Sequence, residues 1–99
     1  MGRFSESTTE DLHVGEMARQ LVGPMLVELR LKGGLVVDGV IRNLNAGNNG
    51  LVWGRRQYRG DVTLELIDGT VANYDFLDIE EVRNVWVERS QAFMDAGKI

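Results

Sequence analysis

Arginines and aromatic rings alternate in one short stretch of this sequence, between residues 53 and 59. The stretch holds two aromatic and three basic side chains, namely Trp53, Arg55, Arg56, Tyr58 and Arg59. Aromatic faces stack on unpaired bases while guanidinium groups hold phosphates, and the same residue types dominate binding energy at protein interfaces. Alternatively, Trp53 packs in the core and the arginines solubilise a loop. The composition thus predicts a nucleic-acid site, a protein interface or a structural loop, and leaves all three open.

Side-chain amides and glycines precede this stretch. Residues 45–50 read Asn-Ala-Gly-Asn-Asn-Gly, without a charge, and Arg42 stands shortly before them. A run so dense in hydrogen-bonding groups is typical of a flexible turn or of a recognition loop. Within a total net charge of −4, residues 30–60 carry +5, while residues 1–29 carry −3 and residues 61–99 carry −6. This pattern suits a local anion site, or a contact between the basic middle and an acidic partner.

Residue types for catalysis or metal binding are scarce. The chain has no cysteine and one histidine, His13, which excludes disulfides, thiolate nucleophiles and thiolate metal ligands. It has no phosphate-binding glycine-rich loop of the form G-x-x-x-x-G-K-S/T. Four acidic residues, Asp75, Asp78, Glu80 and Glu81, lie close together in sequence, but acidic groups on a turn usually form a solvated face. We therefore expect a non-catalytic protein with no metal and no cofactor.

An amphipathic helix is predicted near the N-terminus. Ser7 and Glu10 have the spacing of a capping box, and apolar residues then recur at helical intervals until Gly23-Pro24. The pattern predicts a helix over 8–22. Residues 1–7 show no periodicity and are expected to be disordered.

Glycines organise the first two predicted strands. Residues 25–32 show the two-residue alternation of a half-buried strand. Gly33-Gly34 then predicts a two-residue hairpin turn into a second strand over 35–44. Gly39 interrupts that strand, as glycine does where a strand bends and another backbone comes close. We expect a hairpin whose second strand is long and bent.

Asp68-Gly69 is a second hairpin signal. In chain order, the remaining expected elements are a basic loop over 54–60, strands over 62–67 and 70–76, a helical turn over 77–81, a closing strand over 82–87, and a short helix or frayed tail over 90–99. Residues 51–53 are compatible with a further short strand, which is not counted among the five.

The stretch 31–52 resembles the first motif of the Sm-like proteins, of the LSm and Hfq type. That motif is Leu-x-x-Gly-x-x-hydrophobic-x-Gly-x-aliphatic-x-x-hydrophobic-Asp-x-x-Met-Asn-x-x-aliphatic. The residues at its fixed positions are Leu31, Gly34, Val37, Gly39, Ile41, Leu44, Asn45, Asn48, Asn49 and Val52. Asn45 stands where the family has Asp, and Asn48 where it has Met. Arg59-Gly60 resembles the Arg-Gly pair of the second motif, although nine residues separate Arg59 from Asn49.

This resemblance implies a fold and a ligand. The expected fold is mainly β, with an N-terminal helix followed by a five-stranded, strongly bent antiparallel barrel of the Sm-like or Src-homology-like kind, in one domain over 8–89. In Sm-like proteins the Asp and Asn of this loop bind a base of single-stranded RNA inside a ring of subunits, a role that the resemblance carries to Asn45 and Asn49. The expected nucleic-acid site comprises Arg42, Asn45, Asn49, Trp53, Arg55, Arg56, Tyr58 and Arg59.

Two function hypotheses follow. The first is a non-catalytic Sm-like module that self-associates and binds single-stranded RNA. The alternative is a protein-interaction or small-ligand-binding barrel whose basic loop meets an acidic protein partner. Edge strands need covering, so the closing strand around Val85, Trp86 and Val87 is the expected interface of a homo-oligomer. No apolar run approaches the length of a membrane span, and the first ten residues lack the core of a signal peptide. We expect a cytoplasmic protein without a membrane partner.

Overall fold

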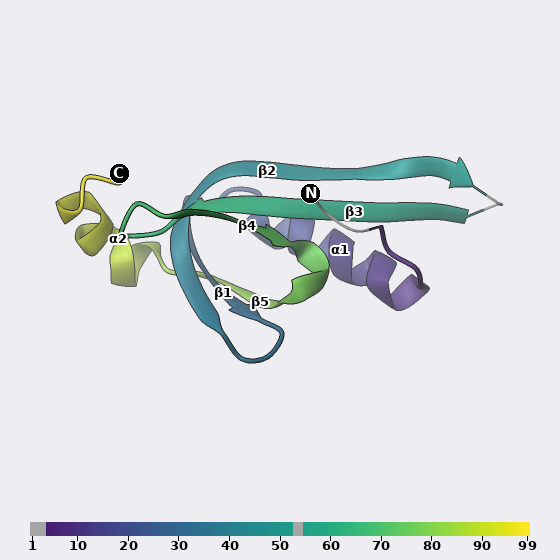
Figure 1. Cartoon of the computed structure of the whole chain (residues 1–99), viewed down its shortest axis with the longest axis horizontal. Helices are drawn as coiled ribbons and strands as arrows, with labels where there is room; N and C mark the ends of the chain where they lie inside the picture. Colours follow the sequence, from purple (N-terminus) through teal and green to yellow (C-terminus); the bar gives the residue numbers. More distant parts are fainter. Residues whose placement is uncertain (1–3, 53–54) are drawn as a thin grey trace.

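The chain folds into one antiparallel sheet that bends sharply around an apolar core (Figure 1). The computed structural model describes residues 4–52 and 55–99, with residues 49–52 and 55–56 given as backbone only. In chain order the elements are α1 (Thr8–Leu21), β1 (Leu26–Leu31), β2 (Val36–Val52), β3 (Arg55–Glu65), β4 (Val71–Asp75), the short 3₁₀ helix η1 (Phe76–Asp78), β5 (Ile79–Asn84) and α2 (Trp86–Asp95). The predicted fold class is confirmed: a helix followed by five bent antiparallel strands.

The sheet is strongly curved but not closed. Its strand order is β4-β3-β2-β1-β5, and η1 joins the two outer strands. Within the described residues, β4 and β5 do not pair with each other. The expected barrel is therefore an open, curled sheet with two free edges.

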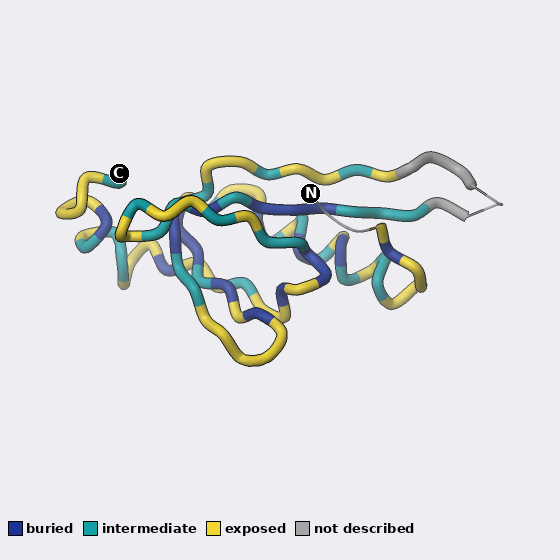
Figure 2. The backbone as a smooth tube through the Cα atoms, viewed as in Figure 1, coloured by how far each residue is buried: buried dark blue, intermediate teal, exposed yellow. Residues whose placement is uncertain are grey.

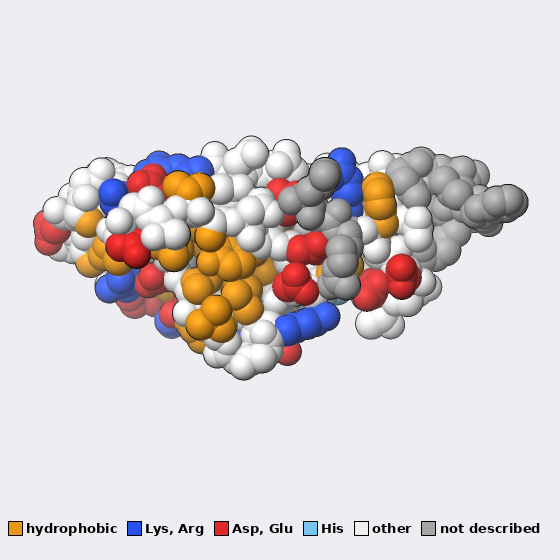
Figure 3. All heavy atoms as spheres, in the orientation of Figure 1, with side chains coloured by type: hydrophobic (Ala, Val, Ile, Leu, Met, Phe, Trp, Pro, Cys, Tyr) orange, Lys and Arg blue, Asp and Glu red, His pale blue; other side chains and the backbone are white. Residues whose placement is uncertain are grey.

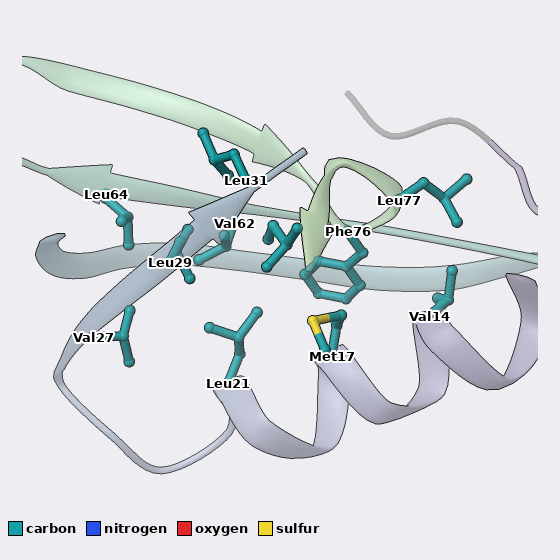
Figure 4. Packing of buried hydrophobic residues seen from close by; sticks show 11 residues of the cluster. Val14, Met17, Leu21, Val27, Leu29, Leu31, Val62, Leu64, Phe76 and Leu77 are labelled. Atoms are coloured by element: carbon teal, nitrogen blue, oxygen red, sulfur yellow. The ribbon is translucent and has the colours of Figure 1, made fainter. Parts of the chain in front are cut away.

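Helix α1 forms where its sequence pattern predicts. The Ser7 side chain accepts a hydrogen bond from the Glu10 N–H at 3.1 Å, which caps the first turn. Val14, Met17 and Leu21 recur on one face of the helix and are buried against the sheet (Figure 4). The predicted helix over 8–22 is confirmed.

The N-terminal segment before α1 is held in place. Ser5 is fully buried, and its N–H donates to the carbonyl oxygen of Tyr58 at 2.6 Å. The expectation of disorder over residues 1–7 is therefore wrong at Ser5. The pattern missed it because no periodicity in sequence reveals a single extended residue docked on a strand.

The hairpin between β1 and β2 contains both predicted glycine features. Gly33 and Gly34 each have φ of +90°, a conformation that glycine adopts without steric cost. The Leu31 N–H donates to the Leu35 carbonyl at 2.8 Å, so the loop has one residue more than the two predicted. At Gly39 a methyl group would lie 2.8 Å from the Glu65 carbonyl oxygen. The strand bends there because it leaves β1 and takes β3 as its partner.

The second hairpin is much longer than the sequence predicts. Residues 45–50 and 55–60 were expected as loops, but they belong to β2 and β3 and pair across the hairpin. The register places Asn45 opposite Asp61 and Asn48 opposite Tyr58. Cross-strand pairing satisfies the backbone here and overrides the turn preference of Asn and Gly. The predicted loops over these residues are therefore wrong, and residues 53–54 lie outside the described residues.

The third hairpin and the end of the chain differ in how well they follow expectation. Gly69 has φ of +89° and the Gly69 N–H donates to the Leu66 carbonyl, which confirms the turn at Asp68-Gly69. The last strand ends at Asn84, and α2 begins at Trp86 with Val85 as its N-cap. The expected strand over 82–87 is therefore wrong at its end. The Val85 N–H still donates to the Leu26 carbonyl of β1 at 3.1 Å, but Trp86 and Val87 belong to α2, and Val85 is buried in one cluster with Phe93 of α2.

Two apolar clusters stabilise the fold. The first fills the concave side of the sheet beneath α1 and consists of Val14, Met17, Leu21, Val27, Leu29, Leu31, Val62, Leu64, Phe76, Leu77 and Ile79 (Figure 4). The second consists of Leu26, Val40, Val85 and Phe93. Figure 2 shows the deepest burial along β1, the middle of β3 and η1. Among the described residues, no helix has the length and apolarity to span a membrane.

Candidate functional site

A polar cavity of about 410 Å³ lies on the outer face of β2, β3 and β4. Its lining residues are Asn43, Asn45, Ala46, Arg59, Asp61, Thr63 and Asn73. The register explains why they meet. Asn45 pairs with Asp61, while Asn43, Thr63 and Asn73 form one row across the three strands. Because alternate residues of a strand share a face, this face is polar and the opposite face carries Val62 and Leu64 into the core.

Asp61 is the centre of the hydrogen bonding in this cavity. Its side chain is almost completely buried, with 3% of the residue exposed. Its Oδ1 accepts from Nδ2 of Asn45 at 3.2 Å and from Nδ2 of Asn73 at 3.1 Å. Nδ2 of Asn73 also donates to Oγ1 of Thr63 at 3.0 Å. A carboxylate only accepts, so it fixes which end of each amide faces it. The Asn45 carbonyl oxygen is thereby turned away from Asp61.

Arg59 is the cation of the cavity. Its guanidinium lies over the ring of Phe4, 5.5 Å from the ring centroid. This geometry is that of a cation–π contact, which draws on the negative face of the ring. Phe4 belongs to the segment that Ser5 anchors on β3. Arg59 is therefore both a lining residue of the cavity and the contact point of the N-terminal segment.

Two predicted site residues lie elsewhere. Arg42 donates from Nε to Glu65 at 2.9 Å and from Nη2 to the Lys98 carbonyl oxygen at 2.7 Å, near the C-terminus. The hydrogen bond from Arg42 holds the pKa of Glu65 below its usual value. Tyr58 is half-buried and packs against the first apolar cluster. Arg42 and Tyr58 are therefore not among the residues that line the cavity with Asn45, and their expected role in binding nucleic acid stays a prediction.

The other predicted site residues cannot be placed. Trp53 lies outside the described residues, and the side chains of Asn49, Arg55 and Arg56 lie outside them as well, although their backbone belongs to β2 and β3. Their roles stay predictions. Of the eight residues expected to bind nucleic acid, the structure brings Asn45 and Arg59 together.

Sequence reasoning missed four lining residues, Asn43, Asp61, Thr63 and Asn73. The available signal was the two-residue alternation of polar side chains along 43–45 and 61–63. It becomes informative only when the strand register is known, because the residues come from three strands. The sequence showed Asp75 only as one member of an acidic turn. In the structure Asp75 is the N-cap of η1, and its Oδ1 accepts a hydrogen bond from the Leu77 N–H at 2.8 Å.

The residues expected to form an oligomer interface separate into two environments. Val85 is fully buried in the second apolar cluster. Trp86 and Val87 lie in the first turn of α2 and are exposed. They line a hollow of about 400 Å³ together with Gly23, Pro24, Met25 and Asn84. An interface on Trp86 and Val87 would thus be a helix surface and not a strand edge.

An N-terminal helix followed by five bent antiparallel strands in the order β4-β3-β2-β1-β5 is an Sm-like fold. A solved protein of Xanthomonas campestris, described as a novel variant of the Sm-like motif, superposes with a TM-score of 0.66 over 84% of this chain and 92% of that chain. The two sequences are 12% identical, so the likeness concerns the fold alone. No family model matches the sequence, and no curated protein matches it.

Proposed function

We propose that this protein is a non-catalytic Sm-like binding module that binds single-stranded RNA at the polar cavity. The observation that carries this proposal is the meeting of Asn45 and Arg59 in one cavity with a buried carboxylate that orients the amide. Oriented amides read the edges of unpaired bases, and a guanidinium binds the backbone phosphate. The Sm-like fold supports the proposal. In the resemblance to the first Sm-like motif, Asn45 stands at the Asp position, which helps to bind a base in that family.

The cavity proposal predicts two different losses. Arg59→Ala should weaken binding of a labelled single-stranded oligoribonucleotide for every base composition, and lower the slope of log affinity against log salt by about 1. Asn45→Ala should weaken binding by about 0.5–1.5 kcal/mol and alter the preference among oligomers of the four bases. Fluorescence anisotropy over a salt series measures both.

Arg83→Ala is the matched control, because it removes one positive charge on β5, where Arg83 pairs with Glu28 and Glu88 at 3.3 Å. It should leave affinity nearly unchanged. Equal losses of RNA affinity in Arg59→Ala and Arg83→Ala would mean that binding depends on net charge alone. That result would contradict RNA binding at the cavity. A salt-insensitive interaction with a small uncharged ligand would favour the alternative hypothesis, since about 300–1,000 Å³ is the usual range for small-molecule pockets.

Self-association is the second part of the proposal. Both outer strands of the sheet are free edges in the described chain, and free edges favour pairing with another chain. Beside β5, Trp86 and Val87 add an exposed apolar surface, with Val87 88% exposed. Such surfaces are typical of subunit contacts.

Val87→Asp tests this surface. A carboxylate buried in the contact should weaken association by about 2 kcal/mol, roughly thirtyfold in dissociation constant. It should not destabilise the subunit, because an acidic residue in the first turn of a helix is favourable. Light scattering over a concentration series gives the mass. Leu12→Asp, at an exposed position of α1, is the control. A wild-type protein that stays monomeric at the highest concentration would contradict self-association.

A further inference from the structure

The N-terminal segment, residues 4–6, occupies a stretch of β3 that β4 leaves open. β4 pairs with β3 only from Asp61 onward in the direction of Glu65. Before Asp61 the backbone of Tyr58 faces Ser5 instead. The Ser5 N–H donates to the Tyr58 carbonyl at 2.6 Å, and the Tyr58 N–H donates to Ser5 Oγ at 2.8 Å. Ser5 Oγ in turn donates to Asp11 of α1. The segment is thus anchored on both β3 and α1.

This segment carries one aromatic ring and one carboxylate, and it leads directly into α1. The Phe4 ring lies over the Arg59 guanidinium, as a nucleic-acid base would. Glu6 ends the segment, and Glu10 and Asp11 lie in the first turn of α1. Figure 3 shows acidic side chains gathered where α1 begins. The Phe4 ring therefore occupies the face of the Arg59 guanidinium that a base would use if RNA bound Arg59.

We infer that residues 4–6 form an intramolecular cover that single-stranded RNA displaces from Arg59 and the β3 edge. This inference rests on the proposed function and names a regulation of the same site. With the cover closed, Arg59 is engaged by Phe4, so only the open fraction of molecules offers its guanidinium to a phosphate. The apparent affinity for RNA is then the intrinsic affinity reduced by that fraction. Weakening the cover raises apparent affinity without a new contact.

Phe4→Ala is the informative variant, because it removes the ring and leaves the backbone hydrogen bond between Ser5 and Tyr58 in place. An exposed cation–π contact corresponds to about a two- to fivefold change in the ratio of closed to open molecules. In a mostly closed population the open fraction rises by the same factor, so RNA should bind about two- to fivefold more tightly. Phe4→Tyr retains the ring and is the matched control, with affinity like that of wild type. A second readout needs no RNA: the rate at which phenylglyoxal modifies Arg59, followed by mass spectrometry, should rise in Phe4→Ala and stay unchanged in Phe4→Tyr.

The two readouts separate the possible failures. Weaker RNA binding by Phe4→Ala would overturn the inference, because the ring would then be a stacking platform for the ligand. An unchanged modification rate at Arg59 would also overturn it, since the ring would not shield the guanidinium. Faster modification with no RNA binding by any variant would support the cover and contradict the proposed function.

Discussion

Phe76→Ala is expected to lower the free energy of unfolding by about 3–5 kcal/mol. Phe76 is fully buried at the point where η1, α1 and β3 meet, and its ring lies above Met17 in Figure 4. Truncation removes the transfer free energy of the ring and leaves a cavity that the surrounding sheet fills only in part. Urea unfolding followed by circular dichroism measures the change, at one fixed protein concentration so that self-association does not enter the comparison.

Phe4→Ala provides the control for the Phe76 experiment. The chemical change is identical, but Phe4 is 38% exposed and lies outside both apolar clusters. Phe4→Ala should lower the free energy of unfolding by well under half of the amount expected for Phe76→Ala. A cost below about 1 kcal/mol for Phe76→Ala would contradict the described packing, because fully buried phenylalanines are not removed so cheaply.

Gly60→Ala should be the second most disruptive change. A methyl group on Gly60 would lie 2.1 Å from Cε2 and 2.2 Å from Cδ2 of Phe76. These distances are far inside van der Waals contact, so the ring or the strand has to move. Overpacking of this kind typically costs about 1–3 kcal/mol and sometimes more. The Phe76 ring thus leaves no space for a side chain at position 60, and this explains why β3 has a glycine there.

Two further variants make the Gly60 experiment specific. Gly47→Ala makes the same change in β2, where no atom lies within 4 Å of the added methyl group. It should be neutral or stabilise by up to about 1 kcal/mol through the unfolded chain. Combining Gly60→Ala with Phe76→Leu should cost less than the sum of the single changes, because the smaller side chain relieves the clash. Strict additivity would contradict a direct contact.

Much of the fold could be predicted because its signals are local. The capping box at Ser7, the alternation along β1 and the turn residues at Gly34 and Gly69 each act within a few positions. Gly39 was informative as well, because a glycine inside a strand indicates that another backbone segment lies close to it, whichever segment that is. These patterns predicted the helix, the hairpins and the bend.

The candidate site was harder to predict because it depends on pairing between distant residues. The amides and glycines at 45–50 favour a loop, and only their partners on β3 make them a strand. Asp61 was not singled out in the sequence, because its role depends on the hydrogen bonds from Asn45 and Asn73 on the two neighbouring strands. At the other end, the apolar run from Val85 to Val87 suits a strand or a helix equally, and burial of Phe93 decides for the helix.

The pairing of β5 with β1 differs from the other strand pairings of this sheet in how far apart its strands lie along the chain. Every other ladder joins strands that follow each other along the chain, whereas this one joins the first strand to the last. Contacts between distant segments repay their loop-closure entropy only late in folding, while hairpins form quickly. The strands β1 to β4, which three successive hairpins join, can thus assemble before β5 pairs with β1. Amide protons along β5 should accordingly exchange with solvent sooner than those in the middle of β3.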